Sequence, residues 1–196
     1  MGEMDVSRQS TAAVTKPDAL AGMEVSRAFI QCAREFLKND YLPKIERCLA
    51  QLTDEQVWWR ANPESNSIGN LLLHLCGNAR QWIVSGLGGE TDRRVRQTEF
   101  AERTMISRSE LRSRLKETLA AVDMVLANFD CQRILDRHRI QDFEVTALNA
   151  IFHVIEHFSM HTGQIILLTK MLANRDLVFY DFSSGKAVHT WHEPSS

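Results

Sequence analysis

The sequence predicts an all-α fold, a four-helix bundle, and three observations support this prediction. Long segments place apolar residues at helical spacing, Ser or Thr caps precede several of them, and short segments rich in glycine, proline or charge separate them. A chain of 196 residues with 44% apolar content suits one domain with a buried core. We therefore expect a single domain over residues 23–196, with a short irregular C-terminal tail.

Residues 1–22 hold few large apolar side chains and include Pro17 and Gly22, so we expect a flexible N-terminal arm there. The first helix should follow from Glu24, and Pro43 is expected to kink or break it. The apolar residues of this helix recur at helical spacing: Val25, Phe29, Phe36, Leu37, Ile45 and Leu49.

Capping patterns mark the next two long helices. The second helix is expected from a cap at Ser67 to Gly88, with an apolar stripe of Ile68, Leu71, Leu72, Leu75, Ala79, Trp82 and Ile83. Ser107 and Glu110 form a capping box for the third helix, whose stripe is Leu111, Leu115, Leu119, Val122, Leu126 and Phe129. A polar link over residues 136–142 is expected after it.

The fourth helix, residues 145–172, is apolar on more than one side. One sector carries Leu148, Ile151, Phe152, Ile155 and Ile166, and another carries Val154, Ile165, Leu168 and Met171. A helix of this kind is either central in the bundle or shared with a second subunit, and the sequence leaves both alternatives open.

Two shorter elements complete the chain. Thr53 and Gln56 form a capping box for a short helix that ends before Pro63 and carries Trp58 and Trp59. The tail from Asn174 should pack as an irregular flap or short hairpin that turns at Gly185, because it holds four large aromatic residues: Phe179, Tyr180, Phe182 and Trp191.

Charge and cysteine content narrow the class of protein. The 23 basic and 25 acidic residues give a formal net charge of -2, so no positive field favours nucleic acid or an anionic membrane. No apolar run approaches the roughly 18–20 residues of a membrane span. The four cysteines form no close pair, which indicates a cytoplasmic protein: Cys32, Cys48, Cys76 and Cys131. We expect neither nucleic acid nor membrane as a partner.

Three histidines of the fourth helix recur every four residues. His153, His157 and His161 lie within an arc of roughly 80° of one helix face, beside apolar residues. A pair at i and i+4 can bind one metal ion, whereas His153 and His161 stand about 12 Å apart along the axis and cannot comfortably share one. Spacing leaves open which pair chelates. A single buried histidine is more often a hydrogen-bonded core residue, but the cluster favours a metal site.

A third ligand must come from another helix, and His74 is the best candidate because it flanks the apolar stripe of the second helix. Three protein ligands leave one coordination position open for water or substrate, as in catalytic sites. Asn78, one turn after His74, and Gln164, three residues after His161, could orient a ligand or bind substrate. His153 could assist as a base or by orienting a ligand.

Several other chemistries are disfavoured. Phe158 follows His157, so the glutamate of an H-E-x-x-H metalloprotease is missing, and the chain has neither a G-x-S-x-G elbow nor a P-loop. Cys76 is more typical of a small buried hydrophobe than of a catalytic thiol. The charged run from Asp92 to Arg96 could attract an anionic cosubstrate, although a solvated loop is the favoured interpretation.

Two motifs resemble a known superfamily. The segment from Ser67 through His74 to Asn78, S-I-G-N-L-L-L-H-L-C-G-N, and the H-x-x-x-H-x-G-Q segment from His157 to Gln164 look like the DinB/YfiT superfamily. Within it the chain is most similar to the DUF1572 group. The likeness covers about residues 24–172, and the second motif is its most specific part.

The resemblance implies an antiparallel four-helix bundle, often dimeric, in which His74, His157 and His161 bind a nickel or zinc ion. It thereby selects the second histidine pair and places His153 outside the ligand set. Some relatives transfer low-molecular-weight thiols such as bacillithiol or mycothiol, and others isomerise small acids.

We therefore expect a homodimeric enzyme that depends on zinc or nickel, with iron and manganese as further candidates, and acts on a small molecule. Low-molecular-weight thiol S-transfer and a hydrolase-like reaction are the candidate activities, assisted by His153, Asn78 and Gln164. The alternatives are a non-catalytic metal-binding or stress-response module and a metal-free dimerisation scaffold.

Overall fold

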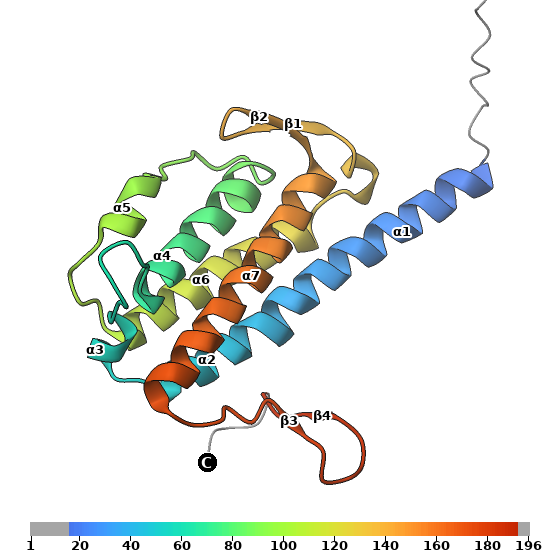
Figure 1. Ribbon diagram of the computed structural model, residues 1–196. Coiled ribbons are helices and arrows are strands. Elements are labelled where there is room, and N and C mark those ends of the chain that lie inside the picture. Colours follow the sequence, from blue (N-terminus) through green and yellow to red (C-terminus); the bar gives the residue numbers. More distant parts are fainter. Residues whose placement is uncertain (1–15, 192–196) are drawn as a thin grey trace, which may run out of the picture.

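The structure, a computed structural model, describes residues 16–191. Its helices form four long rods and its strands two small hairpins, which confirms the predicted all-α bundle. Figure 1 shows the rods packed together with the hairpins at the periphery. Residues 16–22, which we expected in the arm, already belong to a helix; the rest of that arm lies outside the described residues. Pro17 is compatible with this early start because an amide N–H in the first helical turn has no intrahelical partner.

The first rod combines three helical segments: α1 (Lys16–Glu35), the π-helical segment η1 (Phe36–Tyr41) and α2 (Leu42–Ala50). Pro43 has no N–H to donate to the Asn39 carbonyl, so the α-helical ladder is interrupted there. That carbonyl instead accepts a hydrogen bond of 3.1 Å from the indole N–H of Trp191. The proline therefore changes the type of helix without breaking the rod, and the C-terminal tail binds at the interruption.

A short helix, α3 (Asp54–Val57), links the first rod to the second. The expected capping box is present, because Thr53 Oγ1 accepts from the amide of Gln56 and Gln56 Oε1 accepts from the amide of Thr53. The helix ends one residue before Trp58, so it is shorter than expected. The Trp58 indole N–H donates to the carbonyl of Ile106 at 2.8 Å.

The second rod is α4 (Ile68–Ala79) with its π-helical continuation η2 (Arg80–Ser85), and the third is α6 (Arg108–Ala127). Ser67 Oγ accepts from the amide of Asn70 and Ser107 Oγ from that of Glu110, so both helices are capped. The capping box expected at Ser107 is only half formed, because the Glu110 side chain bonds Arg114 instead. A long crossover separates the two rods and contains a helix that the sequence did not predict, α5 (Arg96–Ala101).

The second and third rods run in the same direction (Figure 1). Trp58 packs on Gly69 at the start of α4 and bonds Ile106 at the start of α6, and Gly88 approaches Val125 at the opposite ends. The expected antiparallel arrangement therefore holds between this pair and the two outer rods, but not within the pair. The crossover is long because the chain must return along the bundle before α6 begins.

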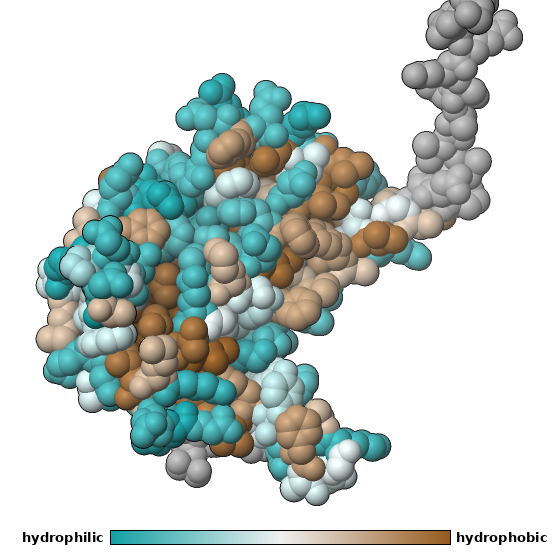
Figure 2. Space-filling model, in the orientation of Figure 1, coloured by the Kyte–Doolittle hydropathy of each residue, from teal (hydrophilic) through white to brown (hydrophobic). Residues whose placement is uncertain are grey.

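The fourth rod is α7 (Ala147–Ala173), which starts where Thr146 Oγ1 accepts from the amide of Asn149. One side of α7 packs in the core, with Ile151, Val154, Phe158 and Ile165 buried. Another side exposes apolar residues to solvent: Leu148, Phe152, Met160, Leu167 and Met171. Figure 2 shows apolar atoms interrupting the hydrophilic surface on the side of the molecule where α7 lies.

Two hairpins complete the structure. After the short 3-10 turn η3 (Cys131–Arg133), strands β1 (Arg137–Ile140) and β2 (Phe143–Thr146) pair antiparallel, with Ile140 opposite Phe143. Gln141 and Asp142 both have positive φ, 50° and 67°, as the two central residues of a tight hairpin turn require. The polar link that we expected over residues 136–142 therefore contains β1 and the turn of this hairpin.

The C-terminal tail forms the second hairpin, β3 (Tyr180–Asp181) and β4 (Val188–His189). Gly185 lies between them with a φ of 75°, a conformation that favours glycine, so the expected turn is confirmed. None of the helices in the described part of the chain is both long and apolar enough to cross a membrane.

Candidate metal centre

Three buried histidines meet between α4 and α7: His74, His157 and His161. The cap at Ser67 starts α4 with its apolar stripe facing the core. Because His74 lies at the edge of that stripe, its side chain is directed toward α7. His157 and His161 come from successive turns of α7. The three residues are only 5%, 8% and 8% exposed, respectively.

The Nε2 atoms of the three rings converge. Nε2 of His157 lies 3.0 Å from Nε2 of His74 and 3.1 Å from Nε2 of His161. A tetrahedral zinc ion with bonds of about 2.0–2.1 Å separates its ligand nitrogens by about 3.3–3.4 Å. The spacing of these atoms is close to that value, so the cluster could hold one metal ion after a small adjustment.

The other ring nitrogens of two histidines are held by acceptors. Nδ1 of His74 lies 2.8 Å from Oε2 of Glu99, and Nδ1 of His161 lies 2.7 Å from Oε1 of Gln164. An ionised carboxylate and an amide oxygen only accept, so each ring carries its proton on Nδ1. The lone pair of each Nε2 is then free for a metal ion.

Glu99 on α5 was not predicted from the sequence. Arg94 donates from Nε to Oε1 at 2.7 Å and from Nη2 to Oε2 at 2.9 Å, and both side chains are less than one-tenth exposed. The favoured interpretation of the run from Asp92 to Arg96 as a solvated loop is therefore wrong for Arg94. This arginine is buried because it compensates the carboxylate that holds His74.

Gly77 provides the space for this carboxylate on the surface of α4. A Cβ at this position would lie 1.9 Å from Oε1 of Glu99. A glycine inside a helix, three residues after His74, was therefore the available sequence signal for a close approach. It did not reveal the partner, because Glu99 follows 22 residues later on another helix.

Burial keeps His157 and His161 neutral. The pKa of His157 falls to about 3, first because the ring is buried and then because of the neighbouring His161 and His74. The pKa of His161 is also lowered, chiefly by burial. Burial acts to raise the pKa of Glu99, but hydrogen bonds from Arg94 and His74 outweigh it and the pKa is lowered. Neutral imidazoles beside an ionised carboxylate suit metal binding.

His153 lies one turn before His157 and is engaged elsewhere. Its Nε2 accepts a hydrogen bond of 3.1 Å from Nδ2 of Asn78, and its ring packs on Trp82 with centroids 4.1 Å apart. The structure thus brings His153 and Asn78 to one side of the cluster and Gln164 to the other. Their catalytic roles stay a prediction. Trp82 is buried, as its place in the apolar stripe indicated.

Cys76 lies two residues after His74 but is not prepared as a nucleophile. Burial raises the pKa of its thiol to about 11. A thiol with this pKa is almost entirely protonated at neutral pH, and the thiolate is the nucleophilic form. The interpretation of Cys76 as a small buried hydrophobe is consistent with this environment.

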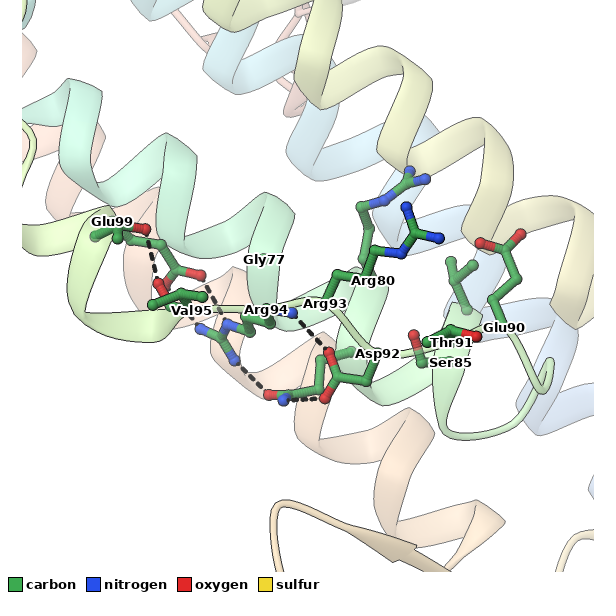
Figure 3. A pocket seen from close by; sticks show the side chains of 13 residues that line it. Gly77, Arg80, Ser85, Glu90, Thr91, Asp92, Arg93, Arg94, Val95 and Glu99 are labelled. Carbon is green, nitrogen blue, oxygen red and sulfur yellow. Dashed lines mark hydrogen bonds and ion pairs between the residues drawn. The ribbon is translucent and has the colours of Figure 1, made fainter.

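A cavity of about 560 Å³ lies beside Glu99 (Figure 3). Residues of α4 and η2, including Gly77 and Arg80, form one wall, and residues 90–99 form the other. Arg94 and Glu99 line the cavity and also contact His74. A single layer of side chains therefore separates the cavity from the histidine cluster.

The bundle and the cluster define a class of helical proteins with a candidate metal site built from two neighbouring helices. The chain belongs to the DUF1572 family, described as a protein of unknown function, whose match covers residues 24–186. This confirms the resemblance on which the ligand set was predicted. No curated protein matches the chain.

Two solved structures share the fold. A conserved protein from Enterococcus faecalis aligns with a TM-score of 0.55 at 16% identity, covering 78% of this chain and 98% of that one. A DinB-like protein from Bacillus cereus aligns with a TM-score of 0.54 at 18% identity, covering 70% of this chain and 91% of that one. The second match is consistent with the DinB/YfiT superfamily, and at these identities the likeness concerns the fold.

Proposed function

We propose that the protein is a metal-dependent enzyme in which His74, His157 and His161 bind one divalent transition-metal ion and a small molecule reacts beside it. The observation that carries this proposal is the convergence of three Nε2 atoms, two of them on rings fixed through Nδ1. Imidazole ligands suit zinc and nickel, and iron and manganese are further candidates.

The protein residues around the cluster have distinct roles in this proposal. Three protein ligands leave a position at which the ion supplies Lewis acidity to a substrate atom. Glu99 and Gln164 orient two ligand rings. Asn78 donates to Nε2 of His153, which leaves the His153 proton on Nδ1, and burial lowers the pKa of this ring. With Nε2 occupied by Asn78, the His153 ring can offer its Nδ1–H to an acceptor atom of the substrate.

Transfer of a low-molecular-weight thiol is the activity we propose to test first. In that reaction the thiol proton passes to solvent, the thiolate sulfur forms a bond to an electrophilic carbon, and a leaving group departs with its electron pair. The raised pKa of Cys76 supports a nucleophile that arrives with the substrate and not from the chain. A hydrolase-like reaction, with water as nucleophile, is the second candidate.

Metal analysis of protein purified without a chelating affinity step tests the proposal. We expect about one equivalent of a transition metal in the wild type, its loss in His74→Ala and His157→Ala, and its retention in the matched variant His153→Gln. Circular dichroism of each variant shows whether the bundle is folded. A wild type that stays metal-free after reconstitution would reject the metal site and favour the scaffold alternative.

The same proteins are then assayed with a panel of small thiols and a chloro-nitroaromatic electrophile. Metal-loaded wild type should catalyse release of chloride and formation of the thioether, whereas His161→Ala should not. Activity that survives in His161→Ala would contradict a role of the cluster in catalysis. A metal-loaded protein that is inactive across thiol-transfer and hydrolysis substrates would favour the non-catalytic metal-binding or stress-response module.

A further inference from the structure

The cavity beside Glu99 contains charged groups that the metal centre does not use. On its walls, Arg94 is paired with Glu99, and Asp92 accepts hydrogen bonds from Nε2 of Gln81 at 2.6 Å and from the backbone N–H of Arg94 at 2.9 Å. These four residues satisfy one another and together carry a net charge of −1, because Asp92 adds a second carboxylate to the Arg94–Glu99 pair.

Two other arginines of the cavity wall have no such partner. Arg80 comes from η2 and Arg93 from the crossover, and neither side chain makes a hydrogen bond or ion pair within residues 16–191. In Figure 3 the dashed lines join Arg94 to its neighbours but reach neither Arg80 nor the side chain of Arg93. Two guanidinium groups are therefore available to a ligand.

The polar groups around these arginines add donors and one opposing charge. The hydroxyls of Ser85 and Thr91 line the same cavity and make no side-chain hydrogen bond to the described residues. Glu90 also lines it without a partner. The lining as a whole is neutral, with three arginines and three carboxylates, so an anion would be held by the unpaired guanidinium groups of Arg80 and Arg93 and by the free hydroxyls, which can donate to an acceptor.

We infer that this cavity binds the oxyanion group, a carboxylate or phosphate, of a small molecule. Arg80 and Arg93 donate to it through their planar guanidinium forks, which match the two oxygens of a carboxylate or phosphate. Ser85 and Thr91 supply further donors. A cavity of about 560 Å³ has the size of a small-molecule site.

The position of the cavity links this anion to the metal centre. Nη2 of Arg94, on the cavity wall, lies 3.1 Å from Nδ1 of His74. A molecule anchored at Arg80 and Arg93 is thus held one side chain away from a proposed metal ligand. The cavity lies on the Nδ1 side of His74, whereas the metal would bind at Nε2, so the anion is a neighbour of the metal centre and reaches it only through Arg94 and Glu99.

Titration with inorganic phosphate and with succinate, followed by NMR of the backbone amides at low ionic strength, tests the inference. We expect saturable shifts centred on residues 80–94, in both metal-loaded and metal-depleted protein. The double variant Arg80→Gln/Arg93→Gln should bind roughly tenfold or more weakly, because it removes two charge-assisted donors. Response to one probe and not the other identifies the preferred oxyanion.

The matched control is Arg112→Gln/Arg114→Gln on α6, which removes the same charge from residues outside the cavity lining that pair with Glu46 and Glu110. Its affinity should stay within about twofold of the wild type. Equal weakening of anion binding in both double variants, or shifts spread over the whole surface, would overturn the inference. Either result would indicate nonspecific electrostatic attraction of the anion to the protein.

Metal content measured on the same samples separates the two proposals. Arg80→Gln/Arg93→Gln should keep its metal, because neither residue contacts a histidine of the cluster. Metal binding without anion binding would reject the subsite alone. Anion binding by a protein that takes up no metal would support the subsite and reject the proposed function.

Discussion

Gly77 is the residue on which the contact between Glu99 and His74 depends. In Gly77→Ala the new Cβ would lie 1.9 Å from Oε1 of Glu99, so the carboxylate must move away from Nδ1 of His74. Alanine favours a helix over glycine by about 1 kcal/mol, so α4 itself should not be weakened. We expect metal affinity to fall by about 10–100-fold, measured by competition with a chromophoric chelator.

The control for this change is Gly163→Ala on α7. A Cβ at Gly163 meets nothing within 4 Å, although the residue lies only two positions after His161. This variant should bind metal as tightly as the wild type. If Gly77→Ala also binds metal with unchanged affinity, Glu99 does not support the ligand, and the arrangement of Arg94 and Glu99 is structural only.

His157 makes the stability of the metal-free protein depend on pH. Its pKa is about 3 in the folded state, well below the ordinary histidine value of about 6.5. Below pH 6.5 the unfolded chain therefore binds a proton that the folded chain excludes, so the free energy of unfolding decreases as the pH falls toward 3. Between pH 7.0 and 5.5 this residue should account for about 1 kcal/mol, measured by urea unfolding.

The lowered pKa values of His153 and His161 act in the same direction and steepen this dependence. The range above pH 5.5 largely avoids the titration of Asp and Glu, so the histidines dominate there. His157→Gln should show a clearly shallower dependence than the wild type. An equal slope in both proteins would mean that His157 accepts a proton in the folded state at ordinary pH.

Among the elements, the long helices could be predicted because each carries its own local signals. Ser67 and Ser107 cap α4 and α6, and the apolar stripes identify the buried faces. The i, i+4 spacing of His157 and His161 placed two candidate ligands on one face of α7. The resemblance then distinguished this pair from His153, whose engagement with Asn78 could not be read from spacing.

The crossover and the first hairpin could not be predicted, because their stability depends on contacts made after the bundle forms. Glu99 on α5 is held by Arg94, which lies in an irregular segment, and by His74, which is distant in sequence. The turn at Gln141 and Asp142 lacks the glycine that usually marks a two-residue hairpin. Local patterns therefore describe the rods better than the segments between them.

The parallel direction of α4 and α6 explains how the carboxylate reaches the site. A short antiparallel connection would turn at the end of the bundle and leave His74 without a partner from the loop. The return along the bundle instead carries Arg94 and Glu99 past the middle of the second rod, where Gly77, in the last turn of α4, leaves room for them. The helix order of the fold therefore contributes directly to the candidate metal centre.

At the scale of the whole molecule, the exposed side of α7 predicts a homodimer. Phe152, Met160, Leu167 and Met171 are 56%, 47%, 60% and 62% exposed and recur at intervals of four to eight residues. At this spacing they lie on one face of the helix, and exposed apolar residues gathered on one face are typical of an interaction site. We expect light scattering to give a mass near twice the 22.4 kDa of the chain.

Phe152→Glu/Leu167→Glu should convert this dimer to a folded monomer, because two charges would be buried without partners in a symmetric interface. Met124→Glu is the matched control, since Met124 is 66% exposed on α6 and should tolerate the charge with the dimer intact. A wild type that is monomeric at micromolar concentration would reject the prediction, and a dimer that persists in the double variant would place the interface elsewhere.

Gln164 lies on the same exposed surface and bonds His161. A dimer formed through this face should therefore slow the exchange of the bound metal with a chelator. The monomeric variant should lose that protection.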